Sequence, residues 1–221
     1  MINYIILGYG IPKNILKDEH YNHYLKTAFN RIFDESAHKE ARILFSGGPT
    51  DIQKPFRRIE ALEMKKLFDT FAQRSFVRKA TKQWKYLLEK KSLSTLGNIL
   101  YSHKILRSKV KRGTVVVICE FTRSPRITKL TKKIFGKNYS TKILPVDFDV
   151  SLNRYDTKLI KEKEAKGLKL DLWALKKPEN FKRYNKLSMR RLADFRAKGP
   201  ARQPETIKKW WEKELKELTL S

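Results

Sequence analysis

Cysteine is almost absent from this chain of 221 residues, which has only Cys119. A single cysteine excludes an internal disulfide and a multi-cysteine metal site, and it fits a reducing compartment. No apolar run approaches the roughly 18 to 20 residues that a membrane-spanning helix needs. The apolar start, residues 1–7, is too short for a signal peptide and predicts a strand instead. We therefore expect a cytoplasmic protein without a transmembrane segment.

Common catalytic signatures are missing too. The chain has no Walker sequence, no His-Glu-x-x-His motif and no nucleophile elbow. Gly8-Tyr9-Gly10 lacks the third glycine of a dinucleotide fingerprint, and no acidic residue stands out after the second predicted strand, which disfavours a dinucleotide-dependent oxidoreductase. The histidines lie in or beside predicted helices and predict no shared metal site: His20, His23, His38 and His103. The sequence leaves open whether the protein is an enzyme.

Acidic residues are scarce relative to basic ones. Lys and Arg number 50 against 23 Asp and Glu, a formal net charge of +27. A charge of this size attracts polyanions such as RNA, anionic membranes or phosphorylated ligands, although a lysine-rich proteome or a solvated surface would also explain it. Basic and aromatic residues alternate from Phe181 to Arg191, so a nucleic-acid-binding protein without catalytic activity is an alternative function. Nothing in the sequence predicts the oligomeric state.

The apolar residues form short runs that alternate with amphipathic segments. Strands are predicted at residues 2–7, 41–45, 84–88, 114–119 and 142–148. The β-branched run 114–119 is typical of a central strand, and Pro145 favours an edge position for the last strand. Ser124 is the expected N-cap of the helix that follows residue 119, with Pro125 at its first position. Five strands alternating with four helices predict a three-layer α/β fold with a mostly parallel sheet and helices on both faces.

The pattern changes near Ser151, which suggests two domains. Residues 1–151 form the expected α/β ligand-binding domain, and residues 152–221 form a basic helical extension. Helical pieces are expected around residues 155–175, 188–198 and 205–218. The last piece carries Trp210 and Trp211 on an apolar stripe, which we expect to dock onto the α/β domain; a surface for a partner or a membrane is the alternative.

Polar clusters directly follow several predicted strands. The carboxyl ends of strands in an open α/β sheet meet at one edge, where loops and helix N-termini bind ligands, usually anionic ones. We expect an anionic, nucleotide-like or phosphorylated small molecule there. The expected ligand-binding residues are Gly8, Gly10, Ser46, Gly47, Gly48, Ser92, Thr95, Asn98, Thr122, Arg123 and Arg126.

Two carboxylates in these clusters are candidate catalytic residues. Glu60 and Glu89 could share one pocket and there take up protons or bind a ribose, an amine or a metal. Ordinary carboxylates at helix N-termini are the alternative interpretation.

The order of these motifs resembles a known family. Leu7-Gly8, Ser46-Gly47-Gly48, Glu60-Ala61 with Met64, and Glu89-x-x-Ser92-x-x-Thr95-x-x-Asn98 precede a β-branched strand and a Thr/Arg loop, as in the YdcF/SanA/ElyC-like domain family. This resemblance covers about residues 1–151 and implies a Rossmann-like sheet. It also implies S-adenosylmethionine as a candidate ligand, because some soluble members are described as binding it; no reaction is assigned to the family.

This chain departs from the family pattern at one position. Where the family usually carries a histidine followed three residues later by an arginine, this chain has Arg123 and Arg126. An acid-base role of that histidine would be lost or changed here. Since arginine stays protonated at ordinary pH, we expect Arg123 to bind a ligand anion as a fixed cation.

Overall fold

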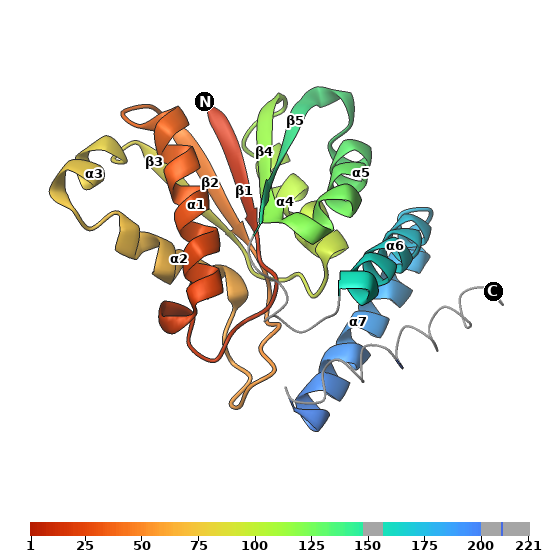
Figure 1. Cartoon of the computed structure of the whole chain (residues 1–221). Helices are drawn as coiled ribbons and strands as arrows, with labels where there is room; N and C mark the ends of the chain where they lie inside the picture. The colour runs from red at the N-terminus through yellow and green to blue at the C-terminus, as the bar shows by residue number, and fades with distance from the viewer. Residues whose placement is uncertain (148–156, 200–208, 210–221) are drawn as a thin grey trace. The chain divides into compact units, whose positions relative to one another are not determined.

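A five-stranded parallel sheet forms the centre of the α/β part of the chain (Figure 1). The structure is a computed structural model that describes residues 1–147, 157–199 and 209. The strands are β1 (Ile2–Leu7), β2 (Ala41–Ser46), β3 (Trp84–Glu89), β4 (Gly113–Glu120) and β5 (Tyr139–Val146), in the order β3-β2-β1-β4-β5. All neighbouring pairs are parallel. The predictions of an interior β4 and of Pro145 on an edge strand are confirmed.

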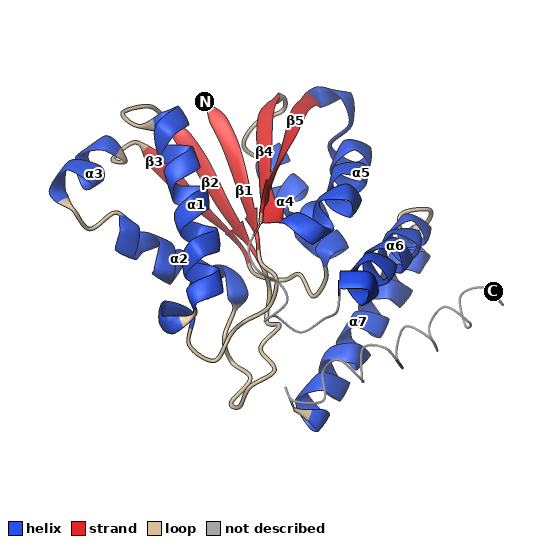
Figure 2. Ribbon diagram, in the orientation of Figure 1, coloured by secondary structure: helices blue, strands red, loops and turns tan. Residues whose placement is uncertain are grey.

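Helices cover both faces of this sheet (Figure 2). They are α1 (Glu19–Ser36), α2 (Glu60–Phe71), α3 (Ser75–Ala80), α4 (Thr95–Arg107) and α5 (Ser124–Phe135). Helices α1 and α2 pack together on one face, and α4 and α5 pack together on the other. The result is the expected three-layer, Rossmann-like α/β fold. The short α3 was not predicted, and β5 begins three residues before the expected position 142.

The core explains why the strands form where they do. Val115–Cys119 of β4 is an uninterrupted buried run, as expected for a strand with helices on both faces. On the α1/α2 face, Phe68 lies between Phe29 and Phe45, with both ring centroids 5.1 Å away. Fully burying side chains of this size contributes about 1.5 to 3 kcal/mol each. These contacts stabilise the sheet that positions the strand-end loops.

The direction of the chain across the sheet reverses between β1 and β4. Strands β1 to β3 progress toward one edge, whereas the chain returns from β3 to β4 and continues to the other edge. With right-handed crossovers, the loops after β1 and β4 therefore leave toward opposite faces, and in open α/β sheets the crevice where such loops diverge is the usual ligand position. At this position the Tyr24 hydroxyl of α1 lies 2.8 Å from Leu7 O and 2.9 Å from Ile118 O, and it can donate to either carbonyl.

A second unit contains Ile52–Phe56 together with Asp149–Ser221, while Met1–Asp51 and Arg57–Phe148 form the α/β unit. Its described part includes α6 (Thr157–Ala174) and α7 (Pro178–Lys198). Tyr184 Oη donates to Asp171 Oδ1 at 2.9 Å and so links the two helices. Helix α7 begins ten residues before the predicted position 188. The expected boundary at Ser151 and the stripe with Trp210 and Trp211 lie outside the described residues.

Among the described helices, none combines the length and the apolar character required to span a membrane.

Candidate functional site

The Glu60 carboxylate organises the loop after β1. Glu60 is the first residue of α2 and is 3% exposed. Its Oε1 accepts hydrogen bonds from Tyr21 Oη at 2.7 Å and from the Gly10 N–H group, and its Oε2 accepts a longer one from Thr50 Oγ1 at 3.4 Å. Gly10 has a φ of 123°, a conformation that favours glycine. The predicted residues Gly10 and Glu60 are thus brought together, and Glu60 ties the β1 loop to α1.

The predicted glycines pack against protein atoms. A Cβ atom on Gly8 would lie 2.1 Å from Glu60 Cδ, and one on Gly47 would lie 2.5 Å from Glu60 Oε2. A Cβ atom on Gly48 would lie 2.0 Å from the Ser92 carbonyl oxygen. Side chains at these three positions would overlap with Glu60 or with the Ser92 backbone. The three glycines thus allow the loops to pack closely against Glu60 and the Ser92 backbone, and their ligand-binding role stays a prediction.

The Glu89 carboxylate organises the loop after β3. Its Oε1 accepts hydrogen bonds from the N–H groups of Lys91 at 2.6 Å and Ser92 at 3.0 Å. Its Oε2 accepts hydrogen bonds from Ser92 Oγ at 2.5 Å and from Ser46 Oγ at 3.0 Å. Ser92 Oγ also contacts the side-chain amide of Asn98. The structure thus brings Ser46, Glu89, Ser92 and Asn98 together in one buried network, in which the four acceptor sites of the carboxylate are filled.

Helix α4 starts beside this network. Its N-cap is Ser94, whose Oγ accepts a hydrogen bond from the Gly97 N–H group at 3.1 Å. Thr95, a predicted ligand-binding residue, is the first residue of the helix and is half-buried. Ser92, Ser94 and Thr95 all lie near the start of the helix and are residue types that cap helices, so the sequence alone does not single out Ser94.

The loop after β4 reaches across the crevice to β1. The Glu120 carboxylate accepts hydrogen bonds from the N–H group and from the Oγ1 of Thr122, both at 2.6 Å. Arg123 Nη1 donates to the Gly8 carbonyl oxygen at 3.0 Å, and Arg123 Nε lies 3.7 Å from Glu120 Oε2. Arg123 therefore joins the two loops that diverge at the reversal point, with its charge partly balanced by Glu120.

The prediction of Ser124 as the N-cap of α5 is wrong. Arg123 holds the cap position in a helical conformation with no side-chain cap hydrogen bond, because the chain already turns in a short 3-10 helix at Phe121–Arg123. Ser124 is the first helical residue, and Pro125 lies in the first turn as expected. Arg126 is in the same turn and is 7% exposed. The positive end of α5 and two arginines thus lie at the end of β4.

Three tyrosines at this edge were not predicted as site residues. The Tyr9 ring stacks on the Tyr21 ring at a centroid distance of 4.2 Å, and its edge contacts Tyr24. Tyr21 Oη accepts a hydrogen bond from the Tyr9 N–H group at 3.2 Å. Burial raises the pKa of Tyr21 well above 10.0, and Glu60 adds to this effect. Burial also raises the pKa of Tyr24, so both hydroxyls stay protonated and act as donors. Tyr21 and Tyr24 have the spacing of a buried helix face, and this spacing does not distinguish a site residue from a core residue.

Comparisons with known proteins add no match to this geometry. No protein-family model matches the chain, and searches of curated proteins and of solved structures also find no match. The resemblance to the YdcF-like family therefore remains a prediction based on the motifs alone. Within residues 1–147 and 157–199, no group of three or more His, Cys, Asp or Glu side chains is arranged to hold a metal ion.

Proposed function

We propose that the protein binds an anionic, nucleotide-like or phosphorylated small molecule at the crevice between the ends of β1 and β4. The observation that carries this proposal is the Arg123 bridge, in which one guanidinium contacts the β1 loop and the β4 loop at the point where they diverge. Open α/β sheets bind ligands at this point. A guanidinium is suited to bind a phosphate or a carboxylate through parallel N–H···O hydrogen bonds.

The local charge supports an anionic ligand. The N-terminus of α5, equivalent to roughly half a positive charge, lies at the end of β4 beside the Arg123 guanidinium, whose charge Glu120 partly balances. A phosphate monoester carries about −1.5 to −2 charges at neutral pH, so a positive helix end attracts it. Since arginine remains protonated, binding should not titrate near pH 6 to 7 through position 123.

S-adenosylmethionine is the ligand that the family resemblance implies, and a cytoplasmic location agrees with the single buried cysteine. We assign no reaction to the site. The Glu60 and Glu89 carboxylates already accept hydrogen bonds from the loops around them. Leaving such buried donors without acceptors costs about 1 to 3 kcal/mol for each, so a transferase or hydrolase step through these carboxylates would have to compensate for that loss.

Isothermal titration calorimetry of the full chain tests the proposed site. The panel contains S-adenosylmethionine, nucleotides and sugar phosphates. The Arg123→Gln, Arg126→Gln variant should lose at least about tenfold in affinity for the compound that binds best, because two charge-assisted hydrogen bonds are removed. Lys129→Gln, Lys133→Gln is the matched control, since both lysines are exposed on the same helix and the change in net charge is equal.

Two outcomes would contradict the proposal. One is that no compound of the panel binds the wild-type chain. The other is that the arginine variant and the lysine control bind equally well while both retain the wild-type circular dichroism spectrum. The second outcome would place the ligand away from the crevice between β1 and β4.

A further inference from the structure

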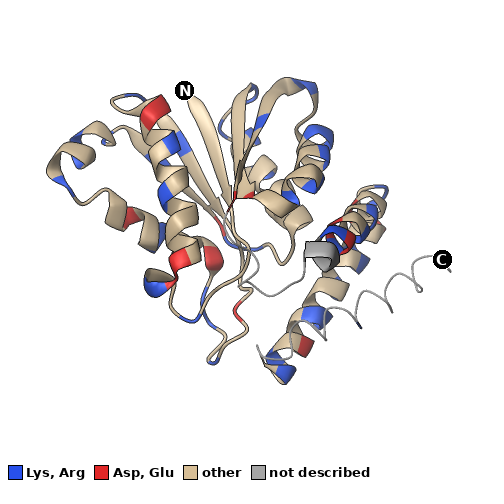
Figure 3. Ribbon diagram, in the orientation of Figure 1, with Lys and Arg blue, Asp and Glu red and all other residues tan. Residues whose placement is uncertain are grey.

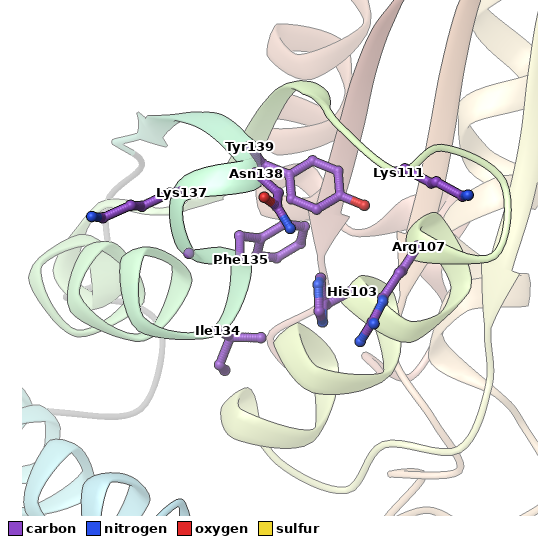
Figure 4. A pocket seen from close by; sticks show the side chains of 9 residues that line it. His103, Arg107, Lys111, Ile134, Phe135, Lys137, Asn138 and Tyr139 are labelled. Atoms are coloured by element: carbon purple, nitrogen blue, oxygen red, sulfur yellow. The ribbon is translucent and has the colours of Figure 1, made fainter.

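A hollow of about 290 Å³ lies at the amino edge of the sheet, opposite the candidate site (Figure 4). The ends of α4 and α5 and the start of β5 enclose it. In its centre the ring of His103 meets the rings of Phe135 and Tyr139 edge-on, with centroid distances of 4.8 and 5.8 Å. Tyr139 Oη donates to the Val110 carbonyl oxygen at 2.5 Å and holds the loop before β4 against the hollow. The floor is therefore built from packed side chains.

Three basic side chains surround this floor. Arg107, Lys111 and Lys137 are exposed, and Figure 4 shows the charged ends of the two lysines directed away from the ring cluster, whereas Arg107 extends alongside His103. In the part of the chain that the structure describes, no carboxylate lies within 4 Å of any of them. Like charges without a counter-ion repel one another, and an anion in the hollow would draw the flexible side chains inward.

Helix termini do not account for this charge. Helices α4 and α5 direct their C-terminal ends toward this edge, and each end is equivalent to roughly half a negative charge. Arg107 in the last turn of α4 is a normal partner for such an end. Lys111 and Lys137, however, lie beyond the ends of α4 and α5. The three basic side chains therefore bring three full positive charges to helix ends that together are equivalent to about one negative charge.

The basic character continues far beyond the hollow. Between residues 90 and 146 the sequence contains fourteen Lys and Arg residues but only one acidic residue, Glu120. Glu120 lies at the opposite edge, where Thr122 and Arg123 contact it. Residues 1–89 contain sixteen basic and ten acidic residues, so the excess is concentrated in the half built from α4, β4, α5 and β5 (Figure 3).

We propose that the hollow binds a phosphate group of a nucleic-acid strand, whose neighbouring phosphates contact the basic surface of α4 and α5. The shared chemistry of a nucleic acid and a small phosphorylated compound is the phosphate itself. The observation that favours the strand is the extent of the charge, which covers the whole half built from α4, β4, α5 and β5. This site is separate from the crevice between β1 and β4.

The side chains of the hollow divide into two roles. Arg107 can donate two parallel hydrogen bonds to a phosphate, while Lys111 and Lys137 act as flexible point charges. Asn138 is exposed and lines the hollow, and its side-chain amide has two N–H donors for a phosphate. Burial lowers the pKa of His103 and the charge of Arg107 lowers it further, so the ring is neutral at pH 7 and offers one donor and one acceptor.

The test measures binding of a fluorescently labelled single-stranded RNA to the full chain by anisotropy, at salt concentrations from about 50 to 200 mM. The Arg107→Gln, Lys111→Gln, Lys137→Gln variant should bind about tenfold or more weakly at the low end. The slope of log K against log salt should become shallower by about 2, since each single-strand phosphate contact contributes about 0.7. The matched control changes three exposed lysines of the other half: Lys26→Gln, Lys66→Gln, Lys82→Gln.

The outcomes decide both the site and the source of the phosphate. A loss confined to the Arg107, Lys111 and Lys137 variant supports the proposal. Equal losses in the two triple variants would show general charge attraction and overturn it, as would an absence of RNA binding by the wild-type chain. Competition by uridine monophosphate or inorganic phosphate as strong as competition by unlabelled RNA would identify a small anion and overturn the assignment to a strand.

A second measurement keeps the test valid if the triple variant does not fold. In the wild-type chain, RNA should shift the backbone amide resonances of Gly136 and Asn138. If RNA binds but leaves these resonances unchanged, the strand does not contact the hollow and the proposal is wrong. The single exposed change Lys137→Gln should still reduce the salt slope by about 0.7.

Discussion

Replacing Gly8 by alanine tests the packing of the β1 loop against Glu60. The added Cβ would lie 2.1 Å from Glu60 Cδ and 2.4 and 2.5 Å from the two carboxylate oxygens, so the carboxylate must move. Overpacking of this kind costs about 1 to 3 kcal/mol. The displaced carboxylate also loses its hydrogen bonds with Gly10 and Tyr21, and bonds to a charged group contribute about 1.5 to 3 kcal/mol each. We expect Gly8→Ala to lower the free energy of unfolding by about 3 kcal/mol or more.

A double-mutant cycle shows whether Glu60 is the cause. Glu60→Ala is itself destabilising because the Tyr21 hydroxyl and the Gly10 N–H group lose their acceptor. In that background the space beside Gly8 is empty, so the second change, Gly8→Ala, should cost little. The coupling energy should therefore be about 2 kcal/mol or more. Glu60→Gln is the control, since glutamine keeps the volume of the side chain and should not rescue Gly8→Ala.

Urea unfolding followed by far-ultraviolet circular dichroism measures all of these variants. Additive effects of Gly8→Ala and Glu60→Ala, within about 0.5 kcal/mol, would refute the reasoning. A rescue by Glu60→Gln equal to that by Glu60→Ala would refute it too, because it would attribute the cost to charge rather than to overlap.

Four further predictions concern the loops and the hollow. Asp51 is fully buried and accepts two hydrogen bonds from the Arg58 guanidinium, at 2.9 and 3.0 Å. Asp51→Asn should therefore lower the free energy of unfolding, measured in urea, by about 3 kcal/mol. A loss below about 1 kcal/mol would contradict this. Glu89→Gln places an amide NH₂ group against the N–H and O–H donors that surround Glu89, so the melting temperature should fall; an unchanged value would show that this network contributes little. The pKa of His103 lies below 6.5 in the folded chain, so the unfolded state takes up a proton first and stability should decline as the pH falls below 6.5. Arg107→Gln should raise the pKa of His103 in an NMR titration, and an unchanged pKa would exclude the charge of Arg107 as a cause.

Much of the fold could be predicted because its signals are local. The uninterrupted run Val115–Cys119 indicates a strand buried on both faces, and Pro145 cannot donate a hydrogen bond to a neighbouring strand, so each indicates its position in the sheet. The predicted start of α5 is one residue too late, because a 3-10 turn directly precedes the helix. That turn depends on how the loop closes, and a capping pattern carries no information about loop closure. Helix α3 has only six residues, too few for a periodic signal.

The candidate site also has parts that the sequence predicts and parts that only the tertiary structure shows. The sequence by itself determined that Ser46, Glu89, Ser92 and Asn98 follow strands and hence gather at one edge, because parallel strands align their carboxyl ends. It also determined the excess of basic residues between positions 90 and 146. Only the tertiary structure decided that the Glu60 side chain occupies the space beside Gly8 and Gly47, and that the ends of α4 and α5 and the start of β5 enclose a hollow around His103. The physical reason is that periodicity and turn chemistry act between neighbours in the chain, whereas these contacts join residues whose distance is set by the packing of both faces of the sheet.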